Sequence, residues 1–153
     1  MLSQSCKYGI WAVLYMASDP DRDFISIREI SNELKISFHF LTKILQSLTR
    51  AKIIVSMRGA NGGVSLARPA KDINLHEIIV AIDGDDIFTS CVLGLPGCGN
   101  EKPCPLHNKW VENREAVTGM CENTNLKDLA LEAESTRWLN SDIFPGFHTI
   151  FKS

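Results

Sequence analysis

Residues 53–68 read IIVSMRGANGGVSLAR, and their pattern is the main sequence signal for the fold. Two β-prone runs, residues 53–58 and 64–68, flank a glycine-rich segment whose Asn61-Gly62 pair is a strong hairpin signal. Glycines in such a turn also let the backbone approach another molecule closely. The stretch therefore predicts a β-hairpin that carries a cation, Arg58, at its base.

Three helices are predicted before this hairpin. Residues 4–17 have apolar side chains at helical spacing, which indicates the first helix. Ser26 and Glu29 form a capping box that opens a second, short helix. After a short turn, Ser37 is the expected N-cap of a third helix that ends near Ala51. Three helices followed by a hairpin make a winged helix-turn-helix, so the predicted class is mainly α with a small β wing.

The third helix has two different faces. Its core face is apolar, and it consists of Leu41, Ile44, Leu45 and Leu48. The opposite face carries hydrogen-bonding groups and a cation, as a helix in the DNA major groove requires. Such a face on an isolated helix is more often simply solvated, and the hairpin that follows it favours DNA. The predicted DNA contacts are Ser37, His39, Thr42 and Lys43 in the helix, with Arg58 and Asn61 in the wing.

Charge and hydropathy narrow the function classes. The net charge is −2, but residues 1–75 carry ten Lys or Arg against six Asp or Glu, while residues 76–153 carry six against twelve. The basic N-terminal half suits a polyanion such as DNA. The sequence has neither a membrane-spanning apolar run nor a signal-peptide pattern at its N-terminus, which predicts a cytoplasmic protein without a membrane partner. No nucleotide-binding loop or paired-carboxylate motif indicates an enzyme.

Three of the five cysteines are clustered. They form the pattern Cys91-x6-Cys98-x5-Cys104-x2-His107. Thiolates and imidazole suit zinc or an iron–sulfur cluster. The gaps are wider than the Cys-x2–4-Cys of common zinc sites, which favours a two-iron cluster. A zinc site of three cysteines and one histidine, and three unligated structural thiols, remain alternatives.

The remaining chain divides around this cluster. Residues 1–84 are predicted to form the DNA-binding domain and residues 85–104 a cluster-binding loop. Cys104 before Pro105 is the expected N-cap of a long helix, since proline favours the first helical position. This helix and a shorter one fill residues 105–135, and residues 136–153 are a tail of unknown role. Leu106, Trp110 and Val117 lie near one stripe of the long helix, which predicts a dimer interface.

Four motifs together point to a family. They are Lys7-Tyr8-Gly9, the segment ISFHFL at residues 36–41, the segment RGANGGV at residues 58–64, and the segment CPLHNKW at residues 104–110. With the cysteine spacing, they make the chain resemble the IscR, NsrR and RirA family of bacterial transcription regulators. The resemblance covers roughly residues 1–130.

The resemblance implies a homodimer on double-stranded DNA with a two-fold symmetric operator. It further implies a [2Fe–2S] cluster in each subunit, although some members hold [4Fe–4S]. Cys91, Cys98 and Cys104 match the three cysteine ligands, and His107 matches the fourth ligand of the IscR-like branch. Lys7 stands where NsrR-like members have an acidic ligand, and a lysine cannot take that role.

The expected function is therefore transcriptional regulation, in which the cluster controls operator affinity. Redox state, nitric oxide and the supply of iron or clusters all remain open as the signal. The alternative is a winged-helix or protein-interaction module that zinc staples together and that has no sensing cluster.

Overall fold

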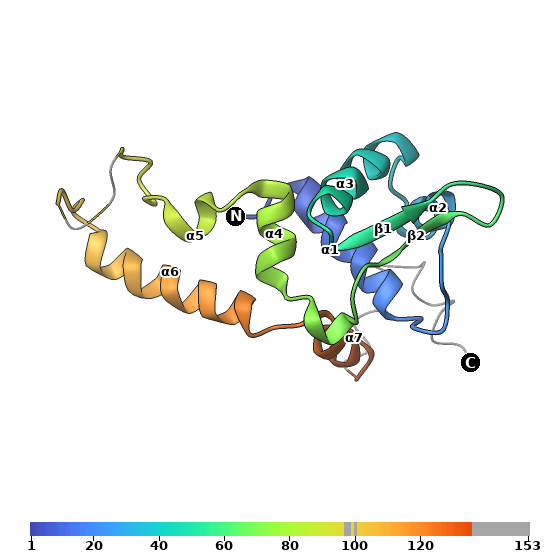
Figure 1. The fold of residues 1–153 in the computed structure, drawn as a ribbon. Coiled ribbons are helices and arrows are strands. Elements are labelled where there is room, and N and C mark those ends of the chain that lie inside the picture. The colour runs from blue at the N-terminus through green and yellow to red at the C-terminus, as the bar shows by residue number, and fades with distance from the viewer. Residues whose placement is uncertain (97–98, 100, 136–153) are drawn as a thin grey trace.

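The structure is a computed structural model that describes residues 1–96, 99 and 101–135. Those residues form a mainly helical fold with one small antiparallel sheet, which confirms the predicted class (Figure 1). The elements are α1 (Gln4–Ala17), α2 (Ile27–Leu34), α3 (Phe38–Arg50), β1 (Ile54–Met57), β2 (Gly63–Leu66), the 3-10 turn η1 (Ala70–Asp72), α4 (Leu75–Asp83), α5 (Asp86–Thr89), α6 (His107–Glu122) and α7 (Leu126–Ser135). The predicted tail at residues 136–153 lies outside the described residues.

Local hydrogen bonds define both the start of α2 and the turn between α2 and α3. The Ser26 hydroxyl accepts a hydrogen bond from the Glu29 N–H and caps α2, as the sequence predicted. Lys35 ends α2 with a left-handed φ of 54°. Buried Ser31 then donates its hydroxyl hydrogen to the Ile36 carbonyl at 2.6 Å. These contacts fix where α3 begins relative to α2.

The hairpin is joined to the segment before α2. β1 and β2 pair antiparallel, with Ile54 opposite Leu66 and Met57 opposite Gly63. The loop between them contains a tight turn, in which the Gly62 N–H donates to the Gly59 carbonyl at 3.0 Å. An isolated bridge also pairs Ile25 with Val64 through two backbone hydrogen bonds of 3.0 and 2.9 Å. In the predicted wing, β2 is therefore bonded both to β1 and to the segment before α2.

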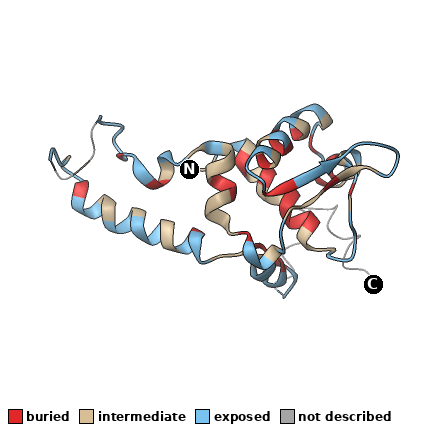
Figure 2. Cartoon of the chain, viewed as in Figure 1, coloured by how far each residue is buried: buried red, intermediate tan, exposed pale blue. Residues whose placement is uncertain are grey.

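The main core lies where α1 packs against α3, α4 and α7 (Figure 2). Leu41, Leu45 and Leu48 point from α3 into this core, which confirms the apolar face that the sequence predicted. The last helix belongs to the same cluster. Leu126, Ala130 and Ala133 of α7 pack there and are at most 8% exposed.

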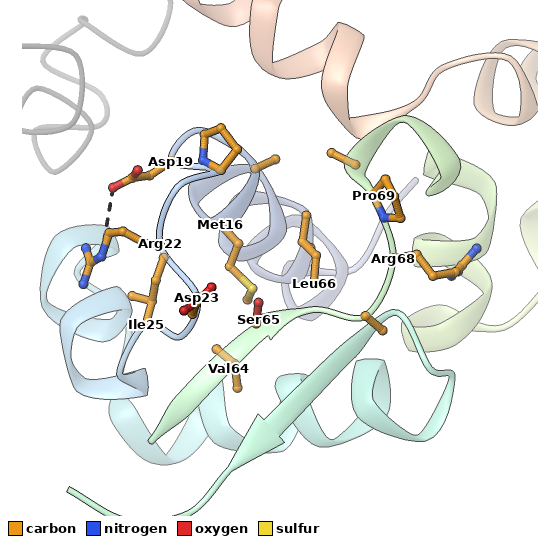
Figure 3. A pocket seen from close by; sticks show the side chains of 14 residues that line it. Met16, Asp19, Arg22, Asp23, Ile25, Val64, Ser65, Leu66, Arg68 and Pro69 are labelled. Atoms are coloured by element: carbon orange, nitrogen blue, oxygen red, sulfur yellow. Dashed lines mark ion pairs between the residues drawn. The ribbon is translucent and has the colours of Figure 1, made fainter. Parts of the chain in front are cut away.

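A cavity of about 320 Å³ lies beside the C-terminal end of α1. Figure 3 shows it between β2, residues 67–70 and the loop after α1. Arg22 in that loop pairs with Asp19 and forms two short contacts, of 2.6 and 2.8 Å, with Glu29. The Tyr15 hydroxyl donates to the same carboxylate, and these bonds hold the pKa of Glu29 below its usual range. The loop is thus tied to α2.

α5 and α6 extend from the other end of the molecule as an arm (Figure 1). A second apolar cluster joins this arm to α1 and α4. It consists of Cys6, Ile79, Phe88 and Cys121. Most of α6 is exposed or half-buried, and its buried residues are His107 at one end and Cys121 at the other. None of the helices within the described ranges is long and apolar enough to cross a membrane.

Candidate metal centre and nucleic-acid interface

Two of the predicted ligands lie close together at the outer end of the arm. The Sγ atoms of Cys91 and Cys104 are 3.6 Å apart. Two sulfurs on one tetrahedral metal ion, each about 2.3 Å from it, lie about 3.8 Å apart. Cys91 is 7% exposed and Cys104 is half-buried, so the pair of thiols is largely shielded from solvent but keeps some access to it. The geometry fits two thiolates that bind the same metal ion.

The other two predicted ligands are less completely defined. Cys98 lies outside the described residues. His107 is the first residue of α6 and is only 9% exposed. Within residues 1–96, 99 and 101–135, no three His, Cys, Asp or Glu side chains are grouped as metal ligands. The full set of four ligands therefore stays a prediction.

The predicted N-cap of the long helix is wrong. Leu106 precedes the first helical residue, and no side chain caps the helix. The Cys104 carbonyl instead accepts a hydrogen bond from the His107 N–H at 2.9 Å, in a turn before the helix. Because this turn takes up Pro105 and Leu106, the Cys104 thiol lies outside α6.

The two cysteines outside the motif are core residues. Cys6 and Cys121 are both buried in the second apolar cluster. Burial, reinforced by Asp83, raises the pKa of the Cys6 thiol to about 12, and burial also raises the pKa of Cys121. Because the thiolate is the form that binds metal, these two side chains are poor ligands.

The predicted dimer residues on α6 have different environments. Leu106, just before α6, and Val117, within α6, are 41% and 36% exposed, and Met120 of α6 is 58% exposed. The Trp110 indole N–H instead donates to the Ser90 carbonyl of its own chain at 2.9 Å. The interface stays a prediction for all three residues, and Trp110 also makes a hydrogen bond within its own chain.

The candidate DNA-binding face is exposed on α3 and the hairpin. Ser37, His39 and Lys43 are exposed, as are Arg58 and Asn61 in the wing. Thr42 is half-buried, and its hydroxyl donates to the Phe38 carbonyl at 2.7 Å. Thr42 therefore offers DNA an acceptor and a methyl group more readily than a donor. The roles of all six residues stay predictions.

Sequence reasoning missed Arg28 as a further candidate. This exposed residue of α2 places its guanidinium 5.1 Å from the centre of the Phe38 ring, at the start of α3. The contact orients a cation next to the exposed N-terminal end of α3. The sequence placed Arg28 in the first turn of the second helix, two residues after the Ser26 cap. Only the packing of α2 on α3 shows that its guanidinium lies beside Phe38.

Lys43→Ala is expected to weaken DNA binding and to flatten its salt dependence. Each lost phosphate contact lowers the slope of log affinity against log salt by about 0.9. Lys127→Ala removes another exposed lysine, from α7, and should leave the slope unchanged. Fluorescence anisotropy on operator DNA at several salt concentrations measures both. Equal slopes for wild type and Lys43→Ala would remove Lys43 from the phosphate contacts.

Known proteins match this chain along most of its length. The model of the Rrf2 family, described as iron-dependent transcriptional regulators, matches residues 2–132. The regulator NsrR of Oceanobacillus iheyensis is 29% identical over 136 residues, which cover 87% of this chain and 91% of that protein. The regulator IscR of Klebsiella pneumoniae is 29% identical over 133 residues, which cover 87% of this chain and 81% of that protein.

A solved structure has the same fold. CymR, described as the global cysteine regulator of B. subtilis, superposes with a TM-score of 0.75 at 25% identity. The match covers 86% of this chain and 97% of CymR. These relatives are regulators, which confirms that the chain is not an enzyme. The chain is therefore a member of the Rrf2 family and a DNA-binding transcriptional regulator.

Proposed function

We propose that an iron–sulfur cluster, bound by Cys91, Cys98, Cys104 and His107, controls the affinity of this regulator for its operator. The observation that carries the proposal is the 3.6 Å separation of the Cys91 and Cys104 sulfurs, which suits two thiolates on one metal ion. The wide gaps between the cysteines favour [2Fe–2S] over a single zinc ion. When bound, such a cluster would supply a one-electron redox change at the end of the arm.

The chain's own residues connect this site to the proposed dimer helix. The Cys104 carbonyl is bonded to the first N–H of α6, so a displacement of Cys104 acts directly on the start of that helix. Exposed Val117 and Met120 on α6 support pairing with a second copy of the chain. A dimer reads two half-sites at a fixed separation. A small reorientation of α6 would therefore change the spacing between the α3 helices of the two subunits.

The comparisons support an iron-containing sensor at the level of the family. The matching family is described as iron-dependent, and two relatives carry the names NsrR and IscR. The likeness to a cysteine regulator extends the family to another kind of signal. The ligand pattern of this chain, rather than the family alone, therefore carries the proposal of a cluster.

The test is the metal content of protein purified without oxygen, together with DNA binding. We expect a coloured protein with visible absorption bands, two irons and two sulfides per chain. Removing the cluster should change operator affinity by about five- to 150-fold, the usual range of coupling between two sites. A colourless protein with one zinc per chain would contradict the proposal. So would a protein that stays free of iron after reconstitution with iron and sulfide.

A further inference from the structure

One face of α6 holds the end of α5. His107, Trp110 and Arg114 are spaced by three and four residues, so they lie along one side of the helix. Trp110 donates its indole N–H to the Ser90 carbonyl, and Arg114 donates a guanidinium N–H to the Thr89 carbonyl, both at 2.9 Å. In Figure 1, α5 lies beside the first turns of α6.

The two accepting carbonyls immediately precede a candidate ligand. α5 ends at Thr89, and Ser90 is its C-cap, so both carbonyls belong to a helix end that needs outside donors. Cys91 is the next residue, and its sulfur is 3.6 Å from that of Cys104. The Cys104 carbonyl is itself bonded to α6 through the His107 N–H. Both members of the sulfur pair are thus anchored to the same two turns of one helix.

We propose that Trp110 and Arg114 are positioning residues for metal ligation, which hold Cys91 at binding distance from Cys104. The reason is geometric. The two bonds join residues 89 and 90, which immediately precede Cys91, directly to α6, so losing them loosens the backbone that carries the thiol. A metal ion would then have to bring the two sulfurs together and would bind more weakly. The inference rests on the proposed metal site but does not depend on which metal occupies it.

Cobalt(II) is the probe, because thiolate ligation gives it an intense absorption whatever the native metal is. The full-length, reduced, metal-free protein is titrated with Co²⁺. Trp110→Phe keeps an aromatic ring and removes the N–H, while Arg114→Gln removes the guanidinium. One lost hydrogen bond should weaken Co²⁺ binding about fivefold, and the double variant should lose more. Arg114→Lys keeps a donor and should restore affinity to within about twofold of wild type.

Matched controls separate positioning from general effects. Lys109→Gln removes an exposed positive charge from the first turn of α6, and Trp11→Phe changes a tryptophan in α1. Both should bind Co²⁺ as wild type does. Far-UV circular dichroism and thermal melting check that each variant is folded before it is titrated.

Each result has a distinct meaning. Weaker binding by Trp110→Phe and Arg114→Gln, with rescue by Arg114→Lys and normal binding by both controls, supports the inference. Folded Trp110→Phe and Arg114→Gln that bind Co²⁺ like wild type would overturn the inference and leave the proposed function intact. A wild-type protein that shows no thiolate–Co²⁺ absorption would overturn the metal site itself and, with it, both proposals.

Discussion

Cys104→Ala is expected to abolish cluster binding. Its sulfur is 3.6 Å from that of Cys91, so removing it breaks the pair that would bind one metal ion. Alanine provides no replacement ligand, and the remaining candidates, Cys91, Cys98 and His107, are too few for a closed four-ligand site. Iron and sulfide counts on anaerobically purified protein should fall from two per chain to near zero. Operator affinity should then equal that of wild type from which the cluster has been removed.

Cys121→Ala is the matched control. It likewise removes one sulfur, but Cys121 lies within α6 and is buried with Cys6, Ile79 and Phe88 in the second apolar cluster. We expect normal iron content and a loss of about 1 kcal/mol in the free energy of unfolding. If Cys104→Ala keeps two irons per chain, Cys104 is not a ligand. If Cys121→Ala loses its iron while it stays folded, Cys121 contributes to cluster binding and is not only a core residue.

Gly63→Ala is expected to destabilise the wing strongly. Gly63 has a φ of 154°, and a Cβ atom there would lie 2.1 Å from the backbone oxygen of Ile25. The backbone cannot yield without breaking the two hydrogen bonds between Ile25 and Val64. Strain and lost bonds together should lower the free energy of unfolding by roughly 2–4 kcal/mol. DNA affinity should also fall, since the wing would detach from the helices.

Gly59→Ala is the appropriate comparison. Gly59 also has a positive φ, of 115°, but nothing lies within 4 Å of a Cβ atom built there. Only backbone strain remains, and it should cost about 1 kcal/mol. Urea unfolding curves for both variants measure the difference. Equal destabilisation would mean that the contact with Ile25 does not hold the wing.

The elements that were predicted well are those whose signals are local. Ser26 caps α2 through a hydrogen bond from the Glu29 N–H, three residues later, so the sequence around Ser26 contains the whole interaction. The hairpin was likewise predicted from Asn61-Gly62 and its β-prone flanks. The start of α6 was misplaced by two residues, because Pro105 was assigned to the helix whereas it lies in the turn that Cys104 and His107 close.

Other features depend on contacts between distant residues, which periodicity does not reveal. A shorter helix was predicted before residue 136, but only the tertiary packing shows that Leu126 of α7 lies in the core beside α1. Trp110 was assigned to a dimer interface from its stripe, yet its indole N–H reaches Ser90, twenty residues earlier. The cysteine spacing identified the ligand types, but the approach of Cys91 to Cys104 comes from the folding of α5 back along α6.

The base of the arm has a consequence for how this protein can change over evolution. The Leu75 N–H donates to the Thr124 carbonyl, and the Leu126 N–H donates to the Ile73 carbonyl, each at 2.9 Å. The start of α4 is therefore bonded to the start of α7, and the segment between them, which includes the arm, is closed at this point. Residues inserted near the tip, between Cys91 and Cys104, lengthen a loop that is already closed, and even a doubling of loop length costs only about 0.6 kcal/mol. A segment that is closed in this way allows related proteins to acquire longer sensory loops while the winged helix keeps its structure.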